Sequence, residues 1–197
     1  MIRYAMWFSA VALMLFGLAG CKVDSINPIS PIDGAQPDKA LYGVWRYKAD
    51  GDLSYVHIGP EFSLAGSDSA ASGKGTKIII VDHKRNGITD ESYVAHTSRI
   101  GNERYLNVVQ VEAGKPAGYI FVRYVLLDKN TVRFATVNEE VLKAAIKDGR
   151  IKGTTRGEGL ASETAITADS AAIENYLRQD GGKLFNRPFL LRRVQSR

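Results

Sequence analysis

The chain has 197 residues, of which 45% are hydrophobic and 24% are charged, and its formal net charge is +5 at pH 7. This length and composition predict one folded domain with small additions, and they exclude a chain that is disordered throughout. The single cysteine, Cys21, excludes an internal disulfide, a CxxC redox motif and any zinc site that needs two thiolates from one chain.

The first twenty residues are typical of a targeting segment. A basic start at Arg3 precedes an apolar stretch from Ala5 to Phe16, which is shorter than the roughly 20 apolar residues that span a bilayer. Leu18-Ala19-Gly20-Cys21 follows. This arrangement resembles the signal peptide and lipobox of bacterial lipoproteins. The alternatives are a transmembrane anchor and an ordinary secretory peptide with a chance cysteine.

The resemblance implies that residues 1–20 are a signal peptide and that Cys21 becomes the lipidated first residue of the mature chain. In a Gram-negative host it implies a diacylglycerol and an N-acyl chain such as palmitate, and two or more chains hold a protein firmly on a membrane. Lys22 stands where enterobacterial lipoproteins of the inner membrane carry an aspartate. The resemblance therefore favours the outer membrane, with the domain facing the periplasm.

Residues 21–39 are expected to form the lipidated N-terminus and a flexible tether. The segment contains Pro28, Pro31 and Pro37 and shows little apolar periodicity. Fully extended at ~3.3 Å per residue, such a tether would reach several tens of Å from the membrane. Residues 40–197 are then expected to form a single β-rich domain.

From Leu41 onward, apolar and polar residues alternate with a period of two, which predicts antiparallel strands with one face in water. Short links such as Arg85-Asn86-Gly87 join sequential neighbours, so the sheet is predicted to be an up-and-down meander. The seven expected strands are Leu41 to Lys48, Leu53 to Gly59, Thr76 to His83, Glu91 to Ile100, Arg104 to Glu112, Gly118 to Asp128, and Thr131 to Asn138.

Two helices interrupt this pattern. Glu139 to Lys147 follow a capping asparagine, and a second helix is expected to begin near Thr167 and to end at Gly181-Gly182. Ile151 to Arg156 form a short eighth strand between them, and Phe189 to Val194 return to pair with the sheet or close it. The predicted fold class is mainly β (α+β), an antiparallel meander forming a barrel-like or strongly curved sheet, with two short helices in the C-terminal third.

Gly43-Val44-Trp45 in the first strand, the following strands and a helix near the C-terminus resemble the lipocalin-type small barrel. The resemblance implies that the Trp45 indole plugs one end of a barrel that binds a small hydrophobic or amphiphilic ligand. A helix directly after the seventh strand departs from the simple lipocalin order. An open sheet packed on the two helices, with Trp45 as an ordinary core residue, is the alternative.

Arg123 is the first candidate for ligand binding, because the period of two places it among apolar residues on one face of its strand. An arginine at the polar end of a cavity would bind an amphiphilic anion. A structural arginine in an ion pair, or one facing solvent, explains the pattern equally well. Tyr105, Trp45 and His57 complete the candidate ligand-binding residues.

No catalytic, metal or cofactor site is expected. None of His57, His83 and His96 has the spacing of a metalloprotease motif, and no serine lies in a G-x-S-x-G sequence. The positive charge is concentrated between Lys183 and the C-terminus, where five basic residues and no acidic one occur. This segment is expected to be a strand with solvated arginines, with attraction to anionic lipid headgroups as the alternative, and no nucleic-acid partner is expected.

Two functions of different classes fit these features. The first is a membrane-anchored envelope protein that binds a ligand inside the barrel, which predicts an apolar cavity on the order of a few hundred Å³. The second is a non-enzymatic accessory protein that interacts with an envelope protein through its surface, which predicts a barrel filled by its own side chains and an exposed apolar or charged patch.

Overall fold

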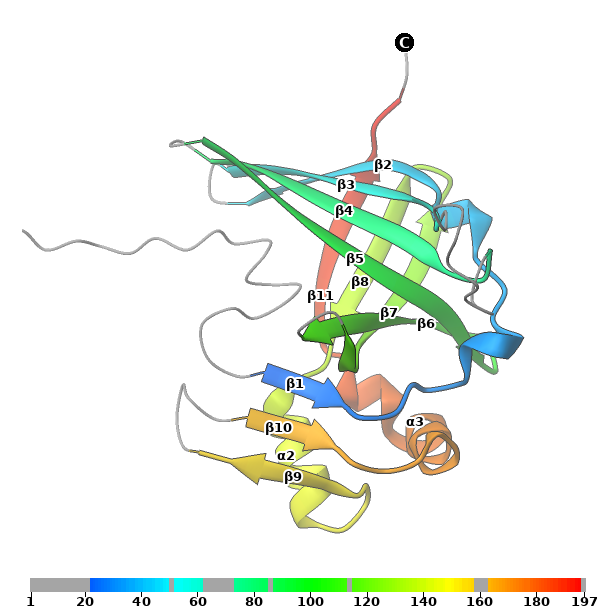
Figure 1. Cartoon of the computed structure of the whole chain (residues 1–197), viewed down its shortest axis with the longest axis vertical. Coiled ribbons are helices and arrows are strands. Elements are labelled where there is room, and N and C mark those ends of the chain that lie inside the picture. The colour runs from blue at the N-terminus through cyan, green and yellow to red at the C-terminus, as the bar shows by residue number, and fades with distance from the viewer. Residues whose placement is uncertain are drawn as a thin grey trace, which may run out of the picture.

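The computed structural model describes residues 22–49, 52–61, 73–84, 87–112, 115–157 and 163–195. These residues form a closed antiparallel barrel with an outer layer of two helices and a small sheet along one side (Figure 1). The expected signal peptide and Cys21 lie outside the described residues. Neither helix of the described part combines the length and the apolar character needed to cross a bilayer.

The barrel closes because the last strand pairs with both ends of a meander. Neighbouring strands from β2 to β8 are antiparallel and follow one another in chain order, and β11 pairs with β8 on one side and with β2 on the other. The predicted fold class and the closing role of the last strand are thus confirmed. The eight strands are β2 (Gly43–Ala49), β3 (Asp52–Pro60), β4 (Thr76–Lys84), β5 (Gly87–Ile100), β6 (Glu103–Glu112), β7 (Lys115–Asp128), β8 (Thr131–Thr136) and β11 (Arg187–Arg193).

Alternate residues of each strand point into the barrel and form an apolar core. Trp45 is completely buried there, and its indole Nε1 donates a hydrogen bond of 2.7 Å to the backbone oxygen of Leu41. Leu41 ends the short 3-10 helix η2 (Lys39–Leu41), which leads into β2. The indole therefore fixes the entry of the chain into the barrel as well as filling the core.

Arg193 covers the Trp45 ring from outside the core. Its guanidinium carbon lies 4.1 Å from the ring centroid, and its nitrogens donate to the backbone oxygens of Ala40, Tyr42 and Lys129. Gly43 makes room for this group, since it has a φ of 136° and a Cβ there would lie 2.5 Å from Nη1 of Arg193. One arginine thus connects three segments at this end of the barrel.

The outer layer packs against the outward face of β6, β7 and β8. It contains α2 (Glu139–Lys147), α3 (Ser170–Leu184) and a small sheet in which β10 (Glu163–Ile166) lies between β1 (Lys22–Ser25) and β9 (Gly153–Arg156). β1 also pairs with β7 at Ser25 and Tyr119, so the small sheet extends the barrel wall. A second apolar core fills the space between, including Tyr105, Phe121, Ile173, Leu177 and Phe185.

The second helix differs from its predicted end. It continues through Gly181-Gly182 to Leu184, where Gly182 is exposed and Gly181 is buried. A Cβ on Gly181 would lie 3.2 Å from the Tyr105 hydroxyl oxygen, so this glycine permits the close approach of the helix to the barrel. It does not serve as a helix stop.

Residues 22–41, here called the N-terminal strap, do not form the expected tether. Ile29 is 1% exposed in the outer core, its amide donates 2.7 Å to Asn107 Oδ1, and Asn27 Nδ2 donates 2.9 Å to the Ala168 oxygen. Asp38 accepts from Arg104 and from Tyr124, each at 3.0 Å. These partners are distant in sequence, so the composition of the segment could not reveal them.

Candidate functional site

The barrel interior, the first place expected for a ligand, is filled by the protein's own side chains. An eight-stranded barrel is a fold compatible with ligand binding, but the pocket that the described residues form inside this barrel has a free volume of only about 30 Å³. That is room for about one water molecule, whereas ligand pockets occupy about 300–1,000 Å³. The side chains around it are all apolar: Val56, Ile58, Ile78, Ile80, Leu106, Val108, Val122, Phe134, Phe189 and Leu191.

Two of the sequence candidates lie on opposite sides of the barrel wall. Trp45 is in the interior beneath Arg193, whereas His57 is exposed on the outer face of β3, opposite Val44 of β2. Their side chains therefore do not belong to one site.

The other two candidates are direct cross-strand neighbours on the outer face, Tyr105 on β6 and Arg123 on β7. Arg123 Nε lies 2.5 Å from Glu103 Oε2, which is the arrangement of a structural ion pair. Tyr105 is 2% exposed and packs on Phe185 at 5.4 Å between ring centroids, and its burial raises its pKa to about 12. Arg123 therefore connects β7 to the neighbouring strand β6, and Tyr105 connects β6 to the residue that ends α3.

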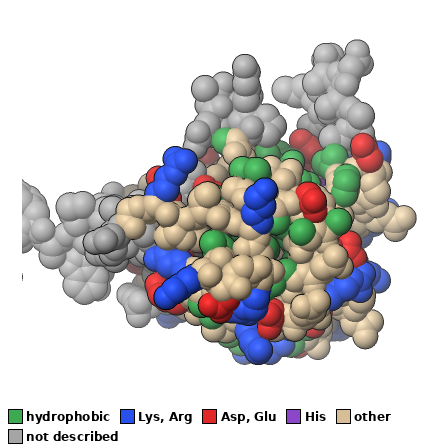
Figure 2. Space-filling model, turned by 90° about the horizontal axis from the view of Figure 1, so that it is seen from below, with side chains coloured by type: hydrophobic (Ala, Val, Ile, Leu, Met, Phe, Trp, Pro, Cys, Tyr) green, Lys and Arg blue, Asp and Glu red, His purple; other side chains and the backbone are tan. Residues whose placement is uncertain are grey.

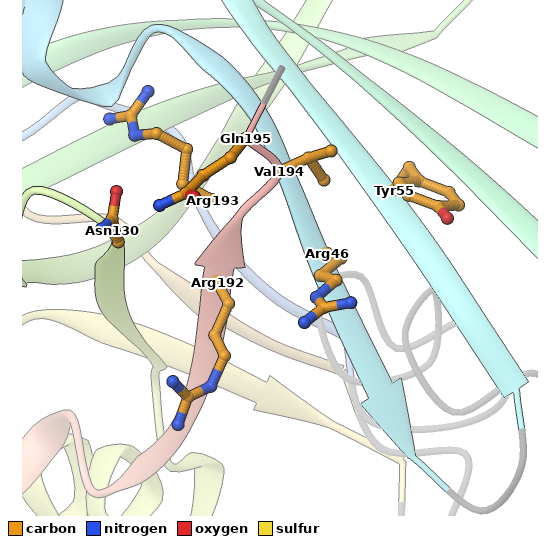
Figure 3. A pocket seen from close by; sticks show the side chains of 7 residues that line it. All are labelled: Arg46, Tyr55, Asn130, Arg192, Arg193, Val194 and Gln195. Carbon is orange, nitrogen blue, oxygen red and sulfur yellow. The ribbon is translucent and has the colours of Figure 1, made fainter. Parts of the chain in front are cut away.

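The described surface does contain two adjoining hollows, both over the outer face of β2 and β11. The first has a volume of about 310 Å³ and is called the basic hollow; it is lined by Arg46, Lys48, Leu53, Leu190 and Arg192. The second, drawn in Figure 3, has a volume of about 420 Å³ and shares Arg46 and Arg192 with the first. Its other lining residues are Tyr55, Asn130, Arg193, Val194 and Gln195, so no described Asp or Glu lines either hollow.

The strand register explains why these cations meet. Trp45 and Leu191 point into the core, so the adjacent residues Arg46 and Arg192 point outward, and the two arginines are paired directly across β2 and β11. Directly opposed residues of an antiparallel pair have Cβ atoms about 4.5–5.5 Å apart. Two like charges are thus held side by side on the surface.

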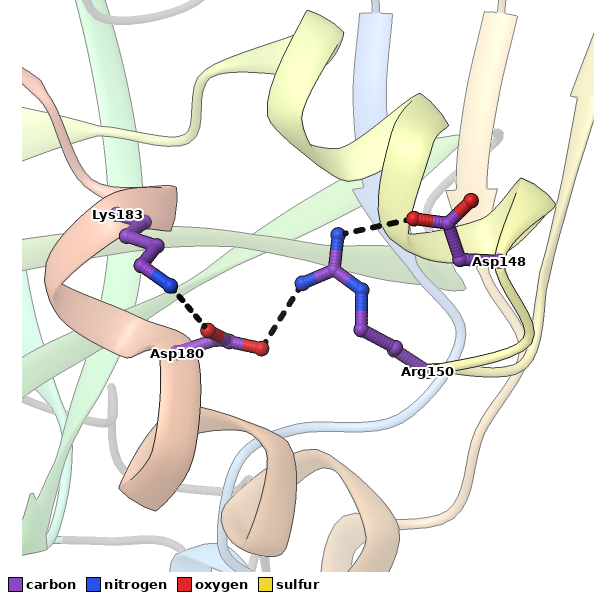
Figure 4. Close-up of polar contacts among 4 residues, drawn as sticks. All are labelled: Asp148, Arg150, Asp180 and Lys183. Atoms are coloured by element: carbon purple, nitrogen blue, oxygen red, sulfur yellow. Dashed lines mark hydrogen bonds and ion pairs between the residues drawn. The ribbon is translucent and has the colours of Figure 1, made fainter.

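Elsewhere on the described surface, charges of opposite sign are mixed. Arg150 Nη1 lies 2.9 Å from Asp180 Oδ2, and Lys183 Nζ lies 3.3 Å from Asp180 Oδ1 (Figure 4). The hydrogen bond from Arg150 lowers the pKa of Asp180. In the face that Figure 2 shows from below, basic and acidic side chains are interspersed. The basic hollow, lined by cations without an acid, differs from these regions.

The sequence drew attention to Arg192 through the charge of the C-terminal segment, but not to Arg46 or Lys48. Those two residues lie in the first barrel strand, far from Arg192 in the sequence, and only the closure of the barrel by β11 brings them to Arg192.

Within the described ranges, no group of three or more His, Cys, Asp and Glu side chains could hold a metal ion. No family model, no curated protein and no solved structure matches this chain.

Proposed function

We propose that this chain is a lipid-anchored protein of the cell envelope whose barrel acts through its surface as an interaction module. The observation that carries the proposal is the filled interior, since a free volume of about 30 Å³ leaves no room for a lipid or another amphiphile. The Leu18-Ala19-Gly20-Cys21 sequence supports attachment at Cys21, on the periplasmic face of the outer membrane. The role is non-enzymatic assistance to an assembly at that membrane.

The N-terminal strap gives this anchor a short reach. The described chain enters the small sheet at Lys22, the residue directly after Cys21, and Ser25 is already paired with Tyr119 of β7. Lipid on Cys21 would therefore hold the domain close against the bilayer. With this attachment, the surface of the domain would act beside the membrane and would not extend away from it.

Intact-mass spectrometry of the full-length chain from an envelope fraction tests the anchor. The expected mass lacks residues 1–20 and includes three acyl chains on Cys21, and the Cys21→Ala variant should retain its full N-terminus. An unmodified Cys21 in the wild-type chain would contradict the proposal.

Native mass spectrometry of the same sample tests the filled interior. A stoichiometric hydrophobic ligand besides the anchor would favour the carrier function instead.

A further inference from the structure

The cations of the basic hollow have no partner within the described protein. Arg46, Lys48 and Arg192 are all exposed and make no hydrogen bond or ion pair with any described residue. The Arg192 charge helps to lower the pKa of Asp128, but it is the last of the causes, and the first is the hydrogen bond from the Asn130 amide. Like charges directly opposite each other on a sheet are destabilising. A bound anion would remove this repulsion.

The geometry of the basic hollow fits an anion that carries an apolar group. In Figure 3 the guanidinium groups of Arg46 and Arg192 both extend toward the end of β2 and the start of β11. Lys48 and Leu190 occupy that part of the two strands, and Leu53 faces Lys48 from β3. Leu190 is 47% exposed, so its side chain offers apolar surface beside these cations. Three cations therefore surround an apolar floor.

Arg193, although it lines the adjoining hollow, is not part of this cation group. Its guanidinium already donates to three backbone oxygens and lies over Trp45. The contrast is informative, because two consecutive arginines of β11 have different roles. Arg193 completes the barrel, whereas Arg192 is left available to a ligand.

We propose that the basic hollow binds the phosphate of an anionic phospholipid headgroup, with Leu53 and Leu190 against the apolar part next to the headgroup. Guanidinium groups match phosphate oxygens in a bidentate manner, and a lysine adds a point charge.

This inference rests on the proposed lipid anchor, which places the domain beside a bilayer. In Figure 1 the start of β1 and the end of β2 lie on the same side of the molecule. Basic segments are attracted to anionic leaflets over about a Debye length.

Isothermal titration calorimetry tests the site. The full chain, held in micelles of an uncharged detergent, is titrated with short-chain phosphatidylglycerol at low salt. Saturable binding at one site is expected, and the double variant Arg46→Gln/Arg192→Gln should bind at least ten-fold more weakly. The matched control Arg156→Gln/Arg178→Gln removes the same charge from exposed positions of β9 and α3 and should bind as the wild type does. Melting curves should show that the first double variant is at least as stable as the wild type, because it loses the like-charge pair.

Three further titrations use short-chain phosphatidylcholine, inorganic phosphate and poly-glutamate. Much weaker binding of all three than of phosphatidylglycerol supports the proposal. Inorganic phosphate that binds as tightly would mean that the hollow takes a free anion, and poly-glutamate that binds as tightly would assign it to an acidic protein partner; either result overturns the lipid assignment. Equal weakening in both double variants, or no binding of phosphatidylglycerol, also overturns it. The measurement does not need lipid on Cys21, so failure of the anchor is seen separately in the intact mass.

Discussion

At the scale of single residues, the Arg193 side chain links parts of the described chain that are far apart in sequence. It comes from the last strand, yet it covers a tryptophan of the first barrel strand and donates to the segment before it. A guanidinium can do this because its donors are fixed in a planar fork, whereas an ammonium is a single compact charge. The contacts of Arg193 at this end of the barrel therefore use the shape of the guanidinium group as well as its charge.

Replacing Arg193 with Gln is expected to lower the free energy of unfolding by about 2–4 kcal/mol, measured by urea denaturation. The variant loses the contact over the Trp45 ring and leaves the oxygens of Ala40, Tyr42 and Lys129 without their donor. Arg193→Lys keeps the charge and should recover only a part of the loss. If Arg193→Lys were as stable as the wild type, charge alone would account for the effect.

His96 is expected to make stability depend on pH. The side chain is 1% exposed, its Nε2 lies 2.8 Å from the Ser30 oxygen of the strap, and the Tyr119 ring packs against it at 6.0 Å. Burial lowers the pKa of His96, so the unfolded chain, with a histidine pKa of about 6.5, binds a proton more readily than the folded one. The free energy of unfolding is then highest above about pH 6.5 and falls as the pH drops toward the folded pKa.

Urea denaturation between pH 7 and pH 5 measures this dependence. His96→Gln should flatten the slope of unfolding free energy against pH, because it removes the group that gains a proton on unfolding. His57→Gln is the matched control, since His57 is exposed on β3 in the folded chain. An equal change of slope in both variants would assign the effect to histidine content and not to the buried position of His96.

At the scale of elements, the N-terminal strap should behave as a part of the fold. Ile29→Ala is expected to lower the free energy of unfolding by about 2–5 kcal/mol, because the Ile29 side chain is buried in the outer core. Ile26→Ala is the matched control at a position that is 56% exposed, and it should cost less than about 0.5 kcal/mol. Urea denaturation of the two variants distinguishes a packed strap from a tether, for which both changes would be neutral.

The strands and helices differ in how well the sequence predicts them, and the reason is the range of the interactions that form them. β3 alternates between buried residues and partly or fully exposed ones, so its pattern is local and readable. β1 and β10 have four residues each and pair in parallel, Lys22 with Glu163, across most of the chain. The end of α3 depends on the space that Tyr105 leaves at Gly181. Such features arise from tertiary contacts that no short window of sequence contains.

The candidate sites follow the same rule. Arg123 lies on the face that the period of two predicts, but that face is covered by the outer layer, and Glu103 is its partner. The basic hollow needs the register between Arg46 and Arg192, which is set only when β11 enters between β8 and β2. Charge in the C-terminal segment was visible in the sequence, whereas its position opposite another arginine was not.

At the scale of the whole molecule, one barrel wall separates two apolar cores. Leu106, Val122 and Phe134 face the interior, and Tyr105, Phe121 and Ala135, their neighbours in sequence, face the outer layer. Both faces of β6, β7 and β8 are therefore buried over part of their length, which explains the nearly continuous apolar run in β7. The inner core leaves a free volume of only about 30 Å³ among the described residues, which supports the proposal that the barrel acts through its surface.

A change that empties part of the inner core tests this arrangement. Phe134 stacks on Phe189, with ring centroids 5.8 Å apart, and is 4% exposed. Phe134→Ala is expected to lower the free energy of unfolding by about 3–5 kcal/mol and to leave a dry cavity that binds xenon. The wild type, with about 30 Å³ free, should bind neither xenon nor a fluorescent fatty acid in its interior. Leu127→Ala, at a position 48% exposed, is the control and should create no cavity. Xenon-detected NMR and fatty-acid titration measure the outcome.

Saturable binding of the fatty acid to the wild type would contradict this arrangement if no anionic headgroup displaced the fatty acid. The barrel would then open to a ligand, and its filled state would be only one of its conformations.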